Sequence, residues 1–189
     1  MHDLEVSPQS VKIRNNAGVI LMAQGQYEEA LEQFGKAIEI RPQRIKSYRL
    51  SGDTLVRLQR EDEAIVMYEK AFSMGSRNTM LLNNMGYVLV DSGIDVERGV
   101  RLIQKAVEKE PENPIFLDSL GWAYYKQGRI REGYDLIKKA IEVDDEGRFE
   151  KQLRPHLEEL ERVIAVAAHV VVRRHPVLTP RHLPAAPPP

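Results

Sequence analysis

The sequence of 189 residues contains no cysteine, which excludes disulfide bonds and thiol chemistry. Aromatic residues are scarce at 6%, and there is a single tryptophan. Neither sign of charge dominates, because 27 Lys and Arg residues stand against 28 Asp and Glu residues. A formal net charge of −1 gives no general electrostatic footprint for nucleic acid or for an anionic membrane surface. We therefore expect no nucleic-acid partner.

Long apolar runs are also missing. Nowhere do 18 apolar residues follow one another, and Met1 to Ser10 holds no basic segment followed by an apolar run. We expect no direct membrane insertion and, by default, a cytoplasmic protein. A chain trimmed from a longer secreted or lipid-anchored protein would look the same, so a periplasmic or envelope-associated location stays open.

What the sequence does contain is an internal repeat. One series of glycines recurs at separations of 34, 34 and 35 residues: Gly18, Gly52, Gly86 and Gly121. One series of alanines recurs at separations of 34, 35 and 34 residues: Ala37, Ala71, Ala106 and Ala140. Two independent series with one period indicate a repeat architecture in which each unit holds an apolar helix, a turn and a second apolar helix.

The repeat divides the chain into segments. We predict a lead-in over residues 1–10, with Ser7 or Ser10 able to cap the first helix, and repeats over 11–44, 45–78, 79–113 and 114–147. After residue 147 the period fails, and Pro155 stands where a long helix would begin or break. An amphipathic pattern returns from His156 to Arg174, which predicts a capping helix within 148–174. Residues 175–189 are rich in proline and are expected to be disordered or extended.

The spacing of Gly18, Tyr27, Ala30, Phe34, Ala37 and Pro42, restated through Trp122, Tyr124 and Ala140, resembles the tetratricopeptide repeat (TPR). The resemblance implies an all-α fold, a right-handed superhelical solenoid of four helix-turn-helix repeats plus a C-terminal capping helix. Gly99 and Gly133 replace the alanine usual in the family, which is expected to weaken individual contacts. The sequence of residues 117–122 is similar to that of bacterial members of the TPR family.

No catalytic or metal-binding pattern accompanies the repeats. There is no Gly-rich phosphate loop, no H-E-x-x-H pair and no G-x-S-x-G turn. None of the five histidines pairs with another at the i, i+4 spacing that would place two ligands on one helical face. We therefore expect no enzyme, no metal and no cofactor.

The resemblance implies that the first helices of the repeats line a concave groove. The candidate residues for binding a peptide or partner segment there are Asn15, Asn16, Arg49, Asp53, Asn83, Asn84, Tyr87, Asp118, Trp122 and Tyr125. Amide side chains can both donate hydrogen bonds to a peptide backbone and accept them from it. The aromatic residues offer a flat apolar surface with one polar group. For Asn16 and Asn84, a bond to a neighbouring helix or turn is the equal alternative.

The family's clamp for chaperone tails, built from Lys, Asn and Arg, is not matched, because Val19, Met80 and Asn84 stand at its positions. The first choice of function is a non-catalytic interaction scaffold or adaptor that holds a peptide or partner segment in its groove. One alternative is a self-assembling module, a homo-oligomer that uses its C-terminal helix or tail in trans. Another is the accessory domain of a larger enzyme.

Overall fold

The computed structural model describes residues 8–174 and shows nine α-helices and no strand in that range. The helices are α1 (Pro8–Ala23), α2 (Tyr27–Ile40), α3 (Ile45–Arg57), α4 (Glu61–Ser73), α5 (Thr79–Asp91), α6 (Val96–Lys109), α7 (Pro114–Lys126), α8 (Ile130–Val143) and α9 (Glu150–Arg174).

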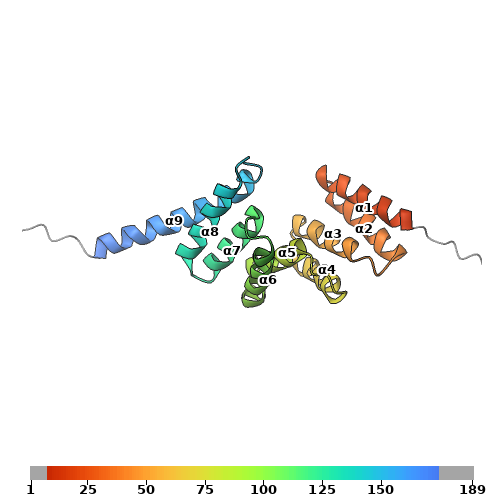
Figure 1. Ribbon diagram of the computed structural model, residues 1–189, viewed down its shortest axis with the longest axis horizontal. Coiled ribbons are helices and arrows are strands. Elements are labelled where there is room, and N and C mark those ends of the chain that lie inside the picture. The colour runs from red at the N-terminus through yellow and green to blue at the C-terminus, as the bar shows by residue number, and fades with distance from the viewer. Residues whose placement is uncertain (1–7, 175–189) are drawn as a thin grey trace, which may run out of the picture.

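The helices form two layers along one curved array (Figure 1). Each first helix packs on the second helix of its own repeat, as α1 does on α2 and α5 on α6. The first helices α1, α3, α5 and α7 also contact one another in sequence. The result is the all-α superhelical repeat fold that the glycine and alanine series predicts.

Glycines set how closely the two helices of a repeat approach. A Cβ atom on Gly18 would lie 2.4 Å from the ring of Phe34, and one on Gly52 would lie 2.4 Å from the ring of Tyr68. In the third repeat the contact is between backbones, because a Cβ on Gly99 would lie 2.6 Å from the carbonyl oxygen of Gly86. The expectation that glycine weakens this contact is therefore wrong.

The same arrangement recurs in the fourth repeat, where a Cβ on Gly133 would lie 2.6 Å from the carbonyl oxygen of Gly121. In these two repeats Ile103 and Ile137 stand where the first two repeats have an aromatic ring. Smaller residues at both positions allow the two helices to come closer. The space that an aromatic ring fills in the first two repeats is therefore closed by the approach of the two backbones.

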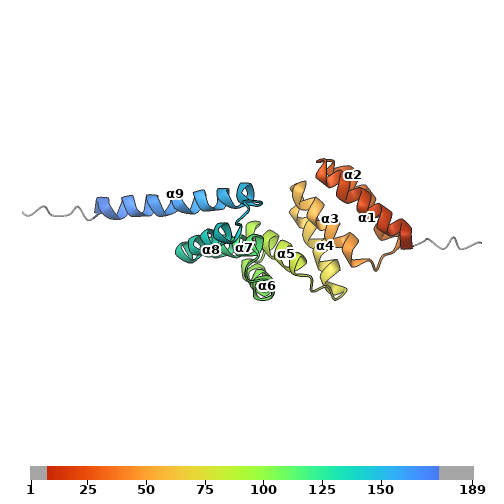
Figure 2. The same cartoon turned by 45° about the horizontal axis from the view of Figure 1, so that its top comes forward.

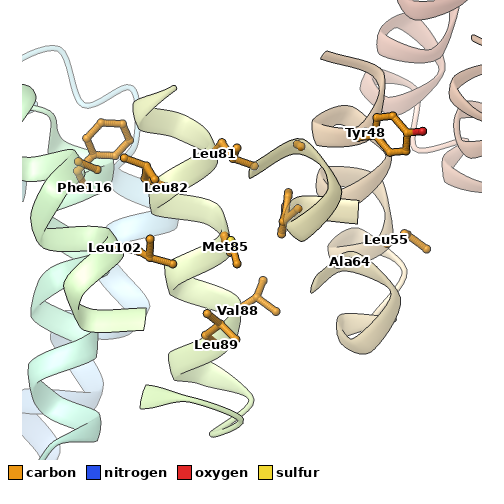
Figure 3. Packing of buried hydrophobic residues seen from close by; sticks show 13 residues of the cluster. Tyr48, Leu55, Ala64, Leu81, Leu82, Met85, Val88, Leu89, Leu102 and Phe116 are labelled. Carbon is orange, nitrogen blue, oxygen red and sulfur yellow. The ribbon is translucent and has the colours of Figure 1, made fainter. Parts of the chain in front are cut away.

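The largest cluster of buried apolar side chains joins the second, third and fourth repeats. It centres on α5, which contributes Leu81, Leu82, Met85 and Leu89 between α3 and α4 on one side and Leu102 and Phe116 on the other (Figure 3). Complete burial of one such side chain contributes roughly 1.5–3 kcal/mol. Contact between neighbouring repeats therefore supplies the core, as expected for a unit that cannot bury its own apolar face.

The two ends differ in detail from the sequence prediction. Helix α1 begins at Pro8, so Ser10 lies inside the helix, while Ser7 lies outside the described residues. Helix α9 begins at Glu150 and contains Pro155. The predicted start at His156 is therefore more than one turn late, because the helix continues through Pro155 at the cost of one i→i−4 hydrogen bond.

Helix α9 packs on α7 and α8 and then extends past α8, away from the array (Figures 1 and 2). Leu153 and Leu160 are fully buried, and Leu153 joins a cluster with Leu117 and Ala140. The segment before α9 is anchored by Asp144, whose carboxylate accepts the backbone N–H groups of Arg148 and Phe149. The proline-rich residues 175–189 lie outside the described residues.

Candidate functional site

A cavity of ≈ 720 Å³ opens along the first helices and ends at α9. We call this cavity the groove. Its apolar lining includes Met22, Val56 and Ile115, and its polar lining includes Tyr27, Asp53, Asn83, Asn84, Tyr87, Asp118 and Ser119. Gln152, Pro155 and His156 of α9 close one end. The groove thus spans all four repeats and carries polar groups between apolar walls.

Asp53 is the centre of a hydrogen-bond network inside the groove. Its carboxylate pairs with Arg49 and accepts a hydrogen bond from the Tyr68 hydroxyl at 2.9 Å. It also accepts one from Nδ2 of Asn84, on the next first helix, at 2.9 Å. Burial raises the pKa of Asp53, while Arg49, Asn84 and Tyr68 act in the opposite direction.

Asn83 continues this network but is not fully satisfied by it. Its Nδ2 donates to Oδ1 of Asn84 at 3.3 Å, while its own Oδ1 has no hydrogen-bond partner among the described residues. The Asn83 side chain lines the groove and the residue is only 2% exposed. An unpaired buried acceptor costs about 1–3 kcal/mol, so a donor brought by a ligand would be favoured here.

His156 of α9 fills the end of the groove nearest the fourth repeat. Its Nδ1 lies 2.8 Å from Oδ2 of Asp118, and its ring stacks on Trp122 with centroids 4.3 Å apart and planes 19° apart. Because a carboxylate only accepts, Nδ1 carries a proton, and Nε2 lies 3.4 Å from the Tyr87 hydroxyl. Tyr87 and Asp118, which line the groove, and Trp122 beside it thus hold one imidazole.

Glu159 of α9 makes a second contact with the fourth repeat. The Tyr125 hydroxyl donates to Oε1 of Glu159 at 3.1 Å, and Nε1 of Trp122 donates to Oδ1 of Asp91 at 2.9 Å. Burial raises the pKa of Asp118, and His156 acts in the opposite direction. The surface that Trp122 and Tyr125 form beside the groove is therefore covered by the chain's own α9.

The predicted site residues fall into three groups. Asp53, Asn83, Asn84, Tyr87 and Asp118 all line the groove. Trp122 and Tyr125 lie beside them but face α9.

The third group lies outside the groove lining. Asn15 is buried between α1 and α3, where its Oδ1 accepts from the Ser47 hydroxyl at 3.1 Å. Asn16 is exposed on α1. Arg49 neutralises Asp53. For Asn84, the bond to a neighbouring helix that was left open as an alternative is present.

Sequence reasoning missed His156, because histidines were considered only as pairs that bind metal. A signal was available in α9. Gln152, His156 and Glu159 stand at i, i+4 and i+7, a polar stripe beside the buried Leu153 and Leu160. Such a stripe next to an apolar face indicates polar contacts with the surface on which the helix docks.

Two other kinds of site are absent from residues 8–174. No group of three or more His, Cys, Asp or Glu side chains in this range is arranged to hold a metal ion. No helix of the same range is both long and apolar enough to cross a membrane.

Residues 9–76 match the family model described as tetratricopeptide repeat. A TPR repeat-containing protein of Pseudomonas aeruginosa is 35% identical over 65 residues, which is 34% of this chain and 11% of that protein. The human mitochondrial import receptor subunit TOM70 is 25% identical over 129 residues, which is 68% of this chain and 20% of the receptor. The chain therefore spans a small part of the length of these relatives.

Solved structures share the fold at low identity. MamA from Desulfovibrio magneticus RS-1 superposes with a TM-score of 0.68 at 19% identity, covering 88% of this chain and 90% of MamA. YrrB, described as a TPR protein with an unusual peptide-binding site, gives a TM-score of 0.59 at 23% identity, covering 78% of this chain and 80% of YrrB.

Proposed function

Because the chain is a tetratricopeptide repeat protein, we propose that it is a protein-protein interaction scaffold that holds an extended partner segment in its groove. The family and its structural neighbours support the role of interaction scaffold. The proposal adds that the ligand is an extended segment and that the groove is its binding site.

The observation that carries it is the buried, unpaired acceptor of Asn83 in the wall of the groove. An extended segment presents backbone N–H groups at regular intervals, so it can satisfy this acceptor while its side chains pack on Val56 and Ile115. The volume of ≈ 720 Å³ lies within the range of about 300–1,000 Å³ typical of ligand pockets.

The contacts of α9 decide which part of the groove is open. His156 and Glu159 occupy the surface around Trp122 and Tyr125. The segment would therefore lie along the first helices beside Met22, Val56 and Asn83 and end at Ile115 and Asp118, next to His156. The description of YrrB as having an unusual peptide-binding site supports peptide binding by this fold.

Selection of random peptides on the full-length chain tests the proposal. We expect selected peptides to bind the unmodified protein and to lose at least tenfold in affinity on Val56→Glu, because a carboxylate would be buried in the groove wall. Val66→Glu is the matched control, since Val66 is 61% exposed on α4 and does not line the groove. Equal losses in both variants, or none in either, would place binding elsewhere.

Self-association is a second candidate, favoured by exposed apolar residues at the two ends of the array. Ile13 and Ile20 on α1 are 61% and 59% exposed, and Val166 on the projecting part of α9 is 55% exposed. Apolar patches at opposite ends suit head-to-tail contacts between copies. The mass of the protein in solution at increasing concentration tests this candidate.

A further inference from the structure

The hydrogen-bond network of the groove has a fixed polarity. It starts at the carboxylate of Asp53, which is held by Arg49 and can only accept. Asn84 must therefore turn its NH₂ group toward Asp53 and its oxygen toward Asn83. Asn83 in turn gives its NH₂ group to Asn84, so the atom left without a partner is an oxygen. The network ends in an acceptor.

A second acceptor lies on the next first helix. Asp118 follows Asn83 by 35 residues, so the two side chains hold the same place in consecutive repeats, and both line the groove. Within residues 8–174 the ion-pair partner of Asp118 is His156, and no Lys or Arg pairs with it. Asp118 is largely buried in the wall of the groove, with 4% of its side chain exposed.

The donors of the groove are largely engaged. The Tyr68 hydroxyl and the Asn84 amide donate to Asp53, and Nδ1 of His156 faces Asp118. Arg57 lines the groove but lies over the ring of Tyr27 and donates to the hydroxyl of that residue at 3.3 Å. Nε of Arg57 is thus engaged, and the acceptors that the groove offers a ligand are those of Asn83 and Asp118.

We propose that the partner segment carries a lysine or arginine side chain, whose N–H donors are accepted by Oδ1 of Asn83 and the carboxylate of Asp118. The inference rests on the proposed function and adds the charge of the ligand to it. A guanidinium group presents five donors in one plane and no acceptor, which complements two acceptors on neighbouring helices. An acidic side chain would instead face Asp53 and Asp118 and bring no donor of its own.

The test compares three seven-residue peptides of alanine and valine, blocked at both ends, with arginine, citrulline or glutamate at the centre. Each carries a fluorophore, and binding to the full-length chain is measured by fluorescence anisotropy. We expect the arginine peptide to bind at least roughly tenfold more tightly than the citrulline peptide, because hydrogen bonds to a charged group are the stronger kind. The glutamate peptide should bind most weakly.

Substitutions assign the preference to these residues. Asn83→Leu keeps the size of the side chain but removes the acceptor, so it should weaken binding of the arginine peptide. Asn16→Leu is the matched control, because Asn16 is exposed on α1 and outside the groove lining. Asp118→Asn removes the negative charge, so it should bring the ratio between arginine and citrulline close to one, and it is the second variant should Asn83→Leu lose its helical circular dichroism.

The outcomes separate this inference from the proposed function. Equal binding of all three peptides, lost in Val56→Glu, would overturn the basic ligand and leave the groove as the peptide site. Tighter binding of the glutamate peptide would overturn it as well. Failure of all three peptides to bind at millimolar concentration would overturn the inference, and failure of selection on random peptides would then overturn the proposed function too.

Discussion

At the scale of single residues, the close contact between the backbones of α5 and α6 depends on the absence of side chains at Gly86 and Gly99. We predict that Gly99→Ala lowers the free energy of unfolding by up to about 2 kcal/mol. The steric cost of about 1–3 kcal/mol arises because the new Cβ would lie 2.6 Å from a backbone carbonyl oxygen, which cannot turn away as a side chain can. The higher helix propensity of alanine, about 1 kcal/mol, offsets only part of it.

Gly35→Ala is the matched control for this substitution. Gly35 lies inside α2, and nothing would stand within 4 Å of its Cβ. There the gain in helix propensity is unopposed, so stability should rise by about 0.5–1 kcal/mol. Urea denaturation followed by circular dichroism measures both values. A rise of equal size in both variants would show that the helices of the third repeat can separate without cost.

Residue spacing predicted these glycine contacts only in part. The 34-residue series identified Gly86 as a position where helices cross, because a small residue that recurs at a fixed period indicates close approach of two backbones. Which atom meets Gly86 was not predictable, since the same position faces an aromatic ring in one repeat and a backbone carbonyl in another. The outcome depends on two positions together. The first repeat has Ala30 where the third has Gly99, and it has Phe34 where the third has Ile103.

At the scale of secondary-structure elements, the contact between α7 and α9 makes stability depend on pH. Burial raises the pKa of Asp118 above its ordinary value of 3.8, so the folded chain keeps this proton at pH values where the unfolded chain has lost it. The contribution of Asp118 to stability is therefore fully present below pH 3.8 and is lost as the pH rises through the raised pKa. Asp118→Asn removes this titration.

We predict that the unfolding free energy of the unmodified chain, measured relative to Asp118→Asn, falls as the pH rises from about 4. Urea denaturation of both proteins at several pH values gives the difference. Glu110→Gln serves as a control of opposite sign, because hydrogen bonds from Thr79 and Asn113 lower the pKa of Glu110. Its contribution is present above pH 4.5 and is lost as the pH falls. A difference for Asp118 that does not change with pH would contradict the prediction.

The elements themselves were predictable because the period of the apolar residues is local information. The placement of α9 was not. Its register on α7 depends on Leu153 and Leu160 fitting against the fourth repeat, and on His156 meeting Asp118, 38 residues earlier in the chain. A pattern within one helix shows which face is apolar, but not which polar group of another helix its neighbouring stripe will meet.

At the scale of the whole molecule, α9 both ends the array and limits the groove. Without it, the face of the fourth repeat that holds Leu117 and Ala140 would be exposed, and Trp122 and Tyr125 would lose their contacts with His156 and Glu159. A repeat array is soluble only when its last unit has a polar outer face, and α9 is the element in position to supply it. The same helix carries the exposed Val166, so it is also the element through which copies would associate.

Two truncations separate these roles of α9. We predict that a chain ending at Asp145 associates or loses solubility, as measured by light scattering over a range of concentrations, while the full chain stays monomeric. Removal of α9 exposes the apolar contact surface of α7 and α8, and such a surface drives association. A chain ending at Arg174 is the control, because it keeps α9 and lacks only residues 175–189.

The masses of the three proteins distinguish a cap from an oligomerisation element. If the full chain and the chain ending at Arg174 are both monomeric, α9 acts within its own molecule and the groove is free for a foreign segment. If both associate and the chain ending at Asp145 does not, α9 binds in trans, and self-assembly replaces the scaffold as the function of this surface. If only the full chain associates, residues 175–189 are the ligand of a second copy, and the groove binds the chain's own C-terminal segment.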